Sequence, residues 1–431
     1  MRAHLKIYFS DVLSLWNEKQ WCVFYSIWRC KRKVKSNGNR VNGRTVLTIT
    51  GALIAYLIGA GFASGNEILQ VFGSWGRKSV WAILGSVLVL TVGSIGIYVI
   101  GAEQKFKGSK EGYCYFGGER FGRLVQIFTG VCLMLNFFTM FAGAGSLMNQ
   151  HLGIPHWVGA LSIGIVSVLA LLKGKKTLQE ILGYAGIIVL VYMIFFGVLT
   201  LLNPSSGSEQ AMGATQAVAE GKILQINLFA LPPFSWIPGM KEQNNAFLTG
   251  ALYGAEALFI SFPFQIMLAQ RSKNRKEAAC SAVVANLSFM LCICVVMVIL
   301  LFNFDCMINP ITGKMNSFPT LAAIKKIMPS AAWSYAILCF IGIFTTISGY
   351  LSAIVEMVFR QKDQSKKCIA FEVCLTVMGI LLGGVLPFST LINVMLPIRG
   401  CVGIVLVVLV LLTLYKRYRC TVHVRVNRST D

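Results

Sequence analysis

Residues 46–72 read VLTITGALIAYLIGAGFASGNEILQVF. The first half of this stretch is an apolar run, but three glycines follow between Gly59 and Gly65, and the polar residues Asn66 and Glu67 come directly after them. Glycine is a poor helix former. Close packing of small residues is an alternative interpretation of the glycines, but it does not explain the adjacent Asn66 and Glu67. We therefore predict a membrane helix that is interrupted near its middle.

The composition of the whole chain supports a membrane protein. Hydrophobic residues make up 55% of its 431 residues and charged residues only 13%, whereas soluble domains carry about 25% charged residues. About 20 apolar residues in a helix cross the hydrocarbon layer, and the chain contains about ten such runs. We expect an all-α integral membrane protein of about ten transmembrane helices. The expected spans are 46–72, 79–101, 124–150, 157–172, 178–202, 246–270, 279–303, 331–358, 369–386 and 389–414.

The basic residues predict the orientation of these spans. The net charge of +22 would also suit a nucleic-acid-binding protein, but the charges lie in short loops and tails. With the N-terminus inside, 31 of the 39 Lys and Arg residues fall in cytoplasmic segments and 7 in outside loops. Cytoplasmic loops of membrane proteins carry this excess. We expect a multi-pass protein of the cell membrane with both termini cytoplasmic, and no nucleic-acid partner.

Short motifs recur at matching places in the two halves of the chain. The residues TGAL at 50–53 in the first span recur at 249–252 in the sixth. The pattern FTxxxG at 138–143 in the third span recurs at 344–349 in the eighth. Five spans are an odd number, so the second half enters the membrane in the opposite orientation, as in many secondary transporters. The expected division is a basic tail at 1–45, five-helix repeats at 46–202 and 246–414, an extracellular loop at 203–245 and a cytoplasmic tail at 415–431.

The sixth span repeats the irregular character of the first. Glu256 places an ionisable group in an apolar segment, where such groups normally face a cavity or a partner. Pro263, which follows in the same span, lacks a backbone N–H and so removes one hydrogen-bond donor from the helix. We predict that this span is interrupted as well, and two interrupted spans in corresponding positions point to a transport site.

The sequence allows more than one role for the polar groups in the eighth and tenth spans. The hydroxyls of Thr345 and Thr346 suit Na⁺, or they bond the preceding turn of their own helix. Arg399 follows Pro397 in the tenth span. It could neutralise a membrane carboxylate, extend to the interface or line the pathway.

The segments 59–70 (GAGFASGNEILQ) and 344–350 (FTTISGY) resemble the YkvI-type bacterial membrane proteins. That family is placed among the amino acid–polyamine–organocation transporters, which share the five-plus-five leucine-transporter fold. The resemblance covers roughly residues 46–415 and excludes both tails.

The resemblance implies a sodium site between the first and eighth spans. Aligned on the glycine pair of the break, its ligands are the carbonyls of Ala55, Ile58 and Gly342 and the hydroxyls of Thr345 and Thr346. A second sodium ion is not expected, because Phe62 stands where many symporters of this fold have an asparagine.

The resemblance also implies that the solute contacts both interrupted spans. Glu67 is an unusual residue at its position, and would bind a proton or a cationic part of the solute. The candidate charge-coupling residues are Glu67, Glu256 and Arg399. The candidate solute-binding residues are Gly59, Gly61, Phe62, Ala63, Ser64, Gly65, Tyr253, Gly254 and Glu256.

We expect a secondary active transporter of a small polar solute such as an amino acid. It would be coupled to Na⁺ and work by alternating access, with spans 1, 2, 6 and 7 moving against 3, 4, 8 and 9. The alternatives are proton coupling through Glu67 or Glu256, and a non-transporting sensor or accessory protein. Motifs of membrane enzymes and clustered metal ligands are missing from the sequence, so we expect no enzymatic activity and no cofactor besides the coupling ion. The sequence specifies neither the solute nor the oligomeric state.

Overall fold

Long apolar runs bounded by Asn, Gly and Pro residues fold into helices throughout the described part of the chain. The computed structural model describes residues 41–172, 175–202, 209–227, 238–239, 245–309, 313, 315–359, 366–385 and 388–428. These residues belong to one compact unit, Arg40–Asp431. Their elements are α3 (Gly43–Leu57), α4 (Ala60–Ser64), α5 (Asn66–Val71), η1 (Gly73–Lys78), α6 (Ser79–Gln104), α7 (Ser109–Gly117), α8 (Glu119–Leu152), α9 (His156–Leu172), α10 (Lys175–Leu202), α11 (Glu209–Ala219), α12 (Ala246–Ala269), α13 (Arg275–Phe302), η5 (Phe304–Cys306), α14 (Pro319–Ile327), η6 (Pro329–Ala331), α15 (Ala332–Val358), α16 (Lys366–Gly383) and α17 (Phe388–Arg428).

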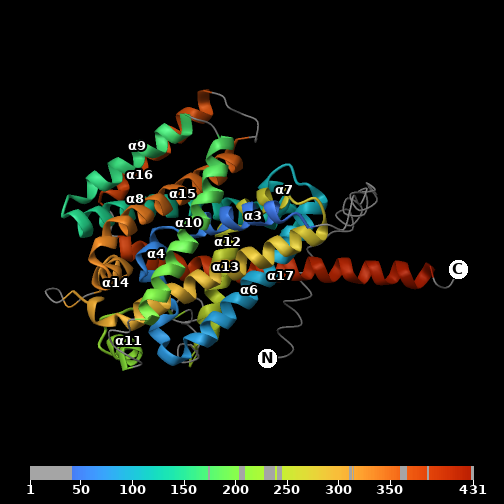
Figure 1. The fold of residues 1–431 in the computed structure, drawn as a ribbon. Coiled ribbons are helices and arrows are strands. Elements are labelled where there is room, and N and C mark those ends of the chain that lie inside the picture. The colour runs from blue at the N-terminus through green and yellow to red at the C-terminus, as the bar shows by residue number, and fades with distance from the viewer. Residues whose placement is uncertain are drawn as a thin grey trace. The chain divides into compact units, whose positions relative to one another are not determined.

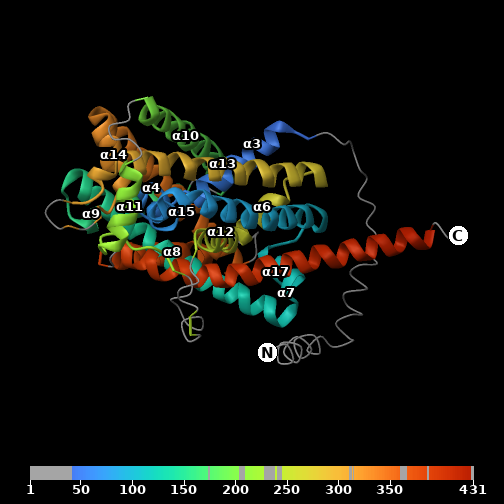
Figure 2. The same ribbon diagram turned by 90° about the horizontal axis from the view of Figure 1, so that it is seen from below.

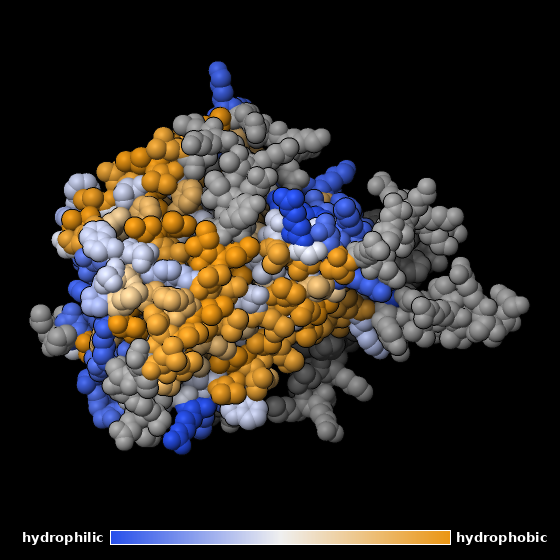
Figure 3. All heavy atoms as spheres, in the orientation of Figure 1, coloured by the Kyte–Doolittle hydropathy of each residue, from blue (hydrophilic) through white to orange (hydrophobic). Residues whose placement is uncertain are grey.

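Helical structure lies over each of the ten expected spans, and several of the helices can cross a membrane. Six helical segments of the described chain are long and apolar enough, and three shorter apolar helices accompany them. Figure 3 shows a broad hydrophobic surface, with hydrophilic residues gathered towards its edges. The chain is therefore a membrane protein with an all-helical fold. The six segments are Gly73–Gln104, Glu119–Leu152, Ala246–Ala269, Arg275–Phe302, Pro329–Val358 and Met395–Arg417.

The helices pack in two sets (Figure 1). In the first set, α6 packs against α12 and α13, and α13 packs against α3. In the second set, α8 packs against α9, α15 and α16. Helices α10 and α17 border the first set, through α3 and α12 respectively. These sets contain the spans that the sequence analysis assigned to the two moving parts.

Glycines bring α6 and α12 close together. A Cβ atom built on Gly250 would lie 1.7 Å from the carbonyl oxygen of Ala82, and one on Gly85 would lie 2.3 Å from that of Phe247. Both contacts are with backbone atoms, which cannot rotate away. Small residues let membrane helices approach in this manner.

The prediction of an interruption in the sixth span is wrong. Helix α12 is continuous from Ala246 to Ala269 and contains Pro263 within it. The proline removes one N–H donor, but neighbouring helices support a helix that contains proline in a membrane protein. Gly254 packs against α6, because a Cβ there would lie 2.6 Å from the carbonyl oxygen of Ser86. Close helix packing thus accounts for the glycine in this span, whereas the glycines of the first span are not explained by packing alone.

Most of the expected C-terminal tail and part of the expected 203–245 loop are helical. Helix α17 continues past residue 414 and through most of the expected C-terminal tail to Arg428, and it extends beyond the other helices in Figure 2. The expected loop at 203–245 contains α11. Residues 1–40, most of the expected N-terminal tail, and much of that loop lie outside the described residues.

Candidate functional site

The first span is interrupted, as its glycines predict. Helix α3 ends at Leu57, Ile58 leaves the helical region with φ −80° and ψ 74°, and Gly59 is extended with φ −88° and ψ −168°. A second break follows at Gly65, which has a φ of +83°. Only glycine adopts such an angle readily, and a Cβ at Gly65 would lie 2.1 Å from Oγ1 of Thr320.

The first break lies against α15, where oxygen atoms gather. The hydroxyl of Thr345 is 3.2 Å from the carbonyl oxygen of Ala55 and 2.9 Å from that of Gly342. The hydroxyl of Thr346 is 3.3 Å from the Ala55 oxygen and 3.1 Å from that of Ile58. The structure thus brings together all five groups that the sequence analysis assigned to a sodium site.

The chemistry of this oxygen cluster fits a monovalent cation. The Tyr56 carbonyl also faces it, 3.5 Å from the Thr346 hydroxyl. Two hydroxyl protons serve four surrounding carbonyls, and each carbonyl has two lone pairs, so lone pairs outnumber donors. The threonines are 1% or less exposed. Buried oxygen ligands in excess of donors are what a hard cation requires.

A small cavity lies beside the break. Its walls come from α3, α4, α5, α8, α12, α13, α15 and α17. The volume open to water-sized spheres is about 40 Å³, and one water needs about 10–15 Å³ on this measure. The cavity therefore holds a few water molecules or a very small solute.

Five of the nine candidate solute-binding residues line this cavity. They are Gly59, Gly61, Phe62, Tyr253 and Glu256. All five are buried, and they come from the broken first span and from α12.

The other four candidates have structural contacts instead. The Ala63 carbonyl accepts a hydrogen bond of 2.7 Å from the Tyr335 hydroxyl. The Ser64 hydroxyl accepts one from the Asn66 amide. Gly65 adopts the left-handed turn, and Gly254 packs against α6. The structure does not bring these four to the cavity.

Arg399 contacts Glu256 across the cavity wall. A guanidinium nitrogen lies 2.9 Å from a Glu256 carboxylate oxygen, and a second donates to the side-chain oxygen of Asn136. Each of the three residues is 5% exposed. Of the roles left open by the sequence, the structure shows Arg399 pairing with Glu256 and lining the cavity.

Glu67 also lines the cavity, from α5. Its carboxylate faces the hydroxyl of Tyr253 as a hydrogen-bond partner. Among the described residues it makes no ion pair, since Arg399 is paired with Glu256. The three charged groups that were candidates for coupling thus surround one cavity.

Several cavity residues escaped the sequence analysis. Asn136, Met140, Phe289 and Tyr350 all line it. Asn136 gave a usable signal, because it is a polar residue in the apolar stretch 130–138. The other three resemble ordinary core residues, and only the rotation of their helices brings them to the cavity.

Side-chain hydrogen bonds hold the loop that precedes α14. Asn66 donates a hydrogen bond of 2.6 Å to the carbonyl of Ser317, just before α14. Gln150 accepts from the Phe318 amide at 2.8 Å and donates to the Phe318 carbonyl at 3.0 Å. The loop that precedes α14 is therefore tied both to the broken helix and to α8.

Aromatic rings pack around Tyr56 and Phe262. The rings of Tyr56 and Phe264 stack with centroids 4.4 Å apart, and the Tyr56 hydroxyl donates to the Ile260 carbonyl at 3.0 Å. Further out, the Tyr113 ring of α7 lies 4.4 Å from that of Phe262.

Two solved transporter structures show the same fold. A manganese transporter from Eremococcus coleocola matches with a TM-score of 0.51 and 14% identity, over 88% of this chain and 80% of that one. The inward-facing conformation of Mhp1, a nucleobase-cation-symport-1 family transporter, matches with a TM-score of 0.51 and 12% identity, over 85% and 75% of the two chains. At these identities the likeness shows the fold, which is that of the leucine-transporter type.

One curated relative is weakly similar in sequence. The uncharacterised membrane protein YkvI of Bacillus subtilis is 25% identical over 161 residues, which are 37% of this chain and 45% of YkvI. The match thus spans less than half the length of that relative. No family model matches the chain.

Proposed function

We propose that the protein is a secondary active transporter that couples Na⁺ to the movement of a small polar solute such as an amino acid. The observation that carries this proposal is the oxygen cluster of Ala55, Ile58, Gly342, Thr345 and Thr346 at the broken helix. A cation site beside a small cavity lined by charged and polar groups is an arrangement that suits symport. The leucine-transporter type of fold supports the same conclusion.

The position of the oxygen cluster suggests how coupling works. Its carbonyls from Ala55 and Ile58 belong to the α3 side of the fold, and its hydroxyls belong to α15. These helices fall in the two different packing sets. A bound Na⁺ therefore stabilises the arrangement in which the sets are closed on each other, and an ion shifts an equilibrium by its differential affinity for the two states.

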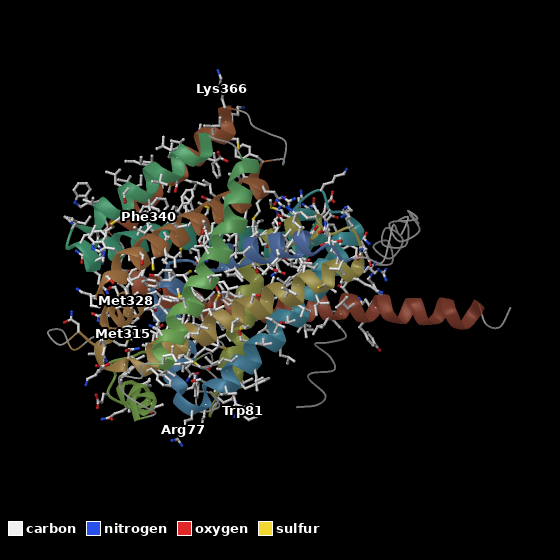
Figure 4. The ribbon with its side chains drawn as sticks, viewed as in Figure 1. Arg77, Trp81, Met315, Met328, Phe340 and Lys366 are labelled. Carbon is white, nitrogen blue, oxygen red and sulfur yellow. The ribbon has the colours of Figure 1, made fainter. Side chains whose placement is uncertain are left out.

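The proposed topology has ten membrane crossings in two inverted sets of five, with both termini in the cytoplasm of the cell. Three tryptophans support it: Trp81, Trp157 and Trp333 are each 59% exposed. They lie in the first turns of α6, α9 and α15, which all begin outside in this topology. Tryptophan is enriched at membrane interfaces, and Figure 4 shows Trp81 close to Arg77 at that end of α6.

Proton coupling is the second candidate mechanism. Glu256 is engaged by Arg399, so of the two carboxylates it is less available to exchange a proton. Glu67 lines the cavity without an ion-pair partner among the described residues. Loss of transport in Glu67→Gln, together with uptake driven by a pH gradient without Na⁺, would identify this mechanism.

Sodium-dependent thermal stability of the purified protein tests the proposal. A ligand that binds only the folded state raises its stability with concentration, so NaCl should raise the melting temperature above that in equal KCl. Thr345→Ala should abolish the difference. Thr200→Ala is the matched control, because the Thr200 hydroxyl is buried but bonds only the Phe196 carbonyl of its own helix. Equal melting curves of the unmodified protein in Na⁺ and K⁺ would contradict the proposal.

A further inference from the structure

Two hydrogen-bond donors in the cavity wall have no partner among the described residues. They are Nε of Arg399 and Nδ2 of Asn136. Both side chains are 5% exposed, and both residues line the cavity. The same two side chains are joined through other atoms, Nη1 of Arg399 and Oδ1 of Asn136. Buried donors without acceptors are unfavourable, so this pair of donors suits a ligand that supplies oxygen acceptors.

A second carboxylate, Glu67, and several aromatic rings also line the cavity. Glu67 faces the Tyr253 hydroxyl, and Phe62, Phe289 and Tyr350 line the cavity with them. The rings of Phe62 and Phe289 have centroids 5.5 Å apart. Ring faces attract cations, and a carboxylate adds a full charge. This part of the wall suits an ammonium group.

Helix α12 sets the spacing between the two parts. Tyr253, which faces Glu67, and Glu256, which binds Arg399, are three residues apart in the helix. Residues at this separation share one face, with Cβ atoms about 5–6 Å apart. Glu67 and Arg399 thus contact α12 at positions about one helical turn apart, which suits a solute with a short carbon chain.

The net charge of the cavity is zero when Na⁺ and such a solute are bound. Glu67 and Glu256 against Arg399 leave one negative charge among the ionisable lining groups. One Na⁺ in the oxygen cluster cancels it, and a zwitterion then adds none. An uncompensated buried charge is strongly unfavourable, so with Na⁺ bound a zwitterion fits better than a cation or an anion.

We propose that the solute is a small zwitterion held by side chains at both ends, with its ammonium group at Glu67 and its carboxylate at Arg399 and Asn136. This inference rests on the proposed sodium-coupled transport. It assigns the recognition of the carboxylate to Arg399 and Asn136, and not to the backbone of the broken helix.

A panel of simple solutes tests the class. The purified full-length protein is titrated in NaCl with glycine, β-alanine and γ-aminobutyrate as zwitterions, with ethylamine as an amine alone, and with acetate as a carboxylate alone. Melting temperature reports binding. At least one zwitterion should bind ten-fold or more tightly than either single-ended compound. Ethylamine binding as tightly as the best zwitterion would overturn the assignment of the carboxylate end.

Two variants test the orientation. Glu67→Gln should weaken the best zwitterion at least ten-fold, because it removes the charge that faces the ammonium group. Asn136→Asp keeps an oxygen for Arg399 but replaces the free donor with a second carboxylate oxygen, so it should also weaken the zwitterion ten-fold or more and spare ethylamine. Glu220→Gln, outside the cavity, is the control. Unchanged zwitterion affinity in either cavity variant would overturn the proposal.

Failure of this proposal differs visibly from failure of sodium coupling. If Na⁺ stabilises the protein and Thr345→Ala removes that effect, but the panel shows no preference for zwitterions, the solute class is wrong and the coupling proposal stands. If neither Na⁺ nor any solute stabilises the protein, both proposals fail.

Discussion

Breaking the buried ion pair between Arg399 and Glu256 should cost much more stability than removing both of its charges. The two side chains are 6% and 7% exposed and their charged atoms are 2.9 Å apart. Removing one partner of such a pair leaves an uncompensated buried charge, which costs about 3–5 kcal/mol. We therefore expect this loss in Arg399→Gln, which leaves two carboxylates in the cavity without a cation, and a smaller loss in Glu256→Gln, where Glu67 of the same cavity still balances Arg399. In the double variant the two amides are neutral and one carboxylate, Glu67, remains in the cavity, so its loss should be smaller than that of Arg399→Gln.

Equilibrium unfolding in detergent micelles measures these free energies, and the four proteins form a double-mutant cycle. Glu119→Gln is the control, because the pair between Glu119 and Arg123 is 68% and 55% exposed and exposed pairs contribute about 0–1 kcal/mol. The reasoning would be refuted by an Arg399→Gln variant within about 1 kcal/mol of the unmodified protein, or by a double variant whose loss equals the sum of the two single losses.

Two glycines give further predictions, each measurable as a change in the free energy of unfolding. Gly65→Ala should lose at least about 1–2 kcal/mol, because it forces a non-glycine residue into the left-handed region and places a Cβ 2.1 Å from Thr320 Oγ1. Gly250→Ala should lose about 1–3 kcal/mol from overpacking, since its Cβ would meet the backbone of Ala82 at 1.7 Å. Gly43→Ala is the control for both, because nothing lies within 4 Å of the added atom. Losses as small as that of the control would contradict the packing argument.

The broken first span could be predicted because its signals are local. Three glycines beside Asn66 and Glu67 disfavour a continuous helix, whatever surrounds them. The helix is broken at Gly59, whose backbone is extended, and at Gly65, whose backbone is left-handed. The same local reasoning failed for α12, where Gly254 and Pro263 have similar helix-breaking character. There the close approach of α6 explains the glycine, and a sequence does not reveal which helix lies opposite.

The cavity depends on rotations of helices that lie far apart in the sequence. The pairing of Arg399 with Glu256 needs α12 and α17 to present these residues to each other. Asn136 and Tyr350 come from α8 and α15, and no local pattern marks Tyr350 as different from a core residue. The sequence therefore singled out the charged groups that line the cavity, and the structure supplied their partners.

Uptake into proteoliposomes tests the central claim of sodium-coupled transport most directly. The solute is the compound that most stabilises the purified protein, and the drive is a Na⁺ gradient or a pH gradient of equal size. We predict accumulation with the inward Na⁺ gradient, loss of that accumulation in Thr345→Ala, and unchanged accumulation in Thr200→Ala. Accumulation driven by the pH gradient alone and unaffected by Na⁺ would contradict the account.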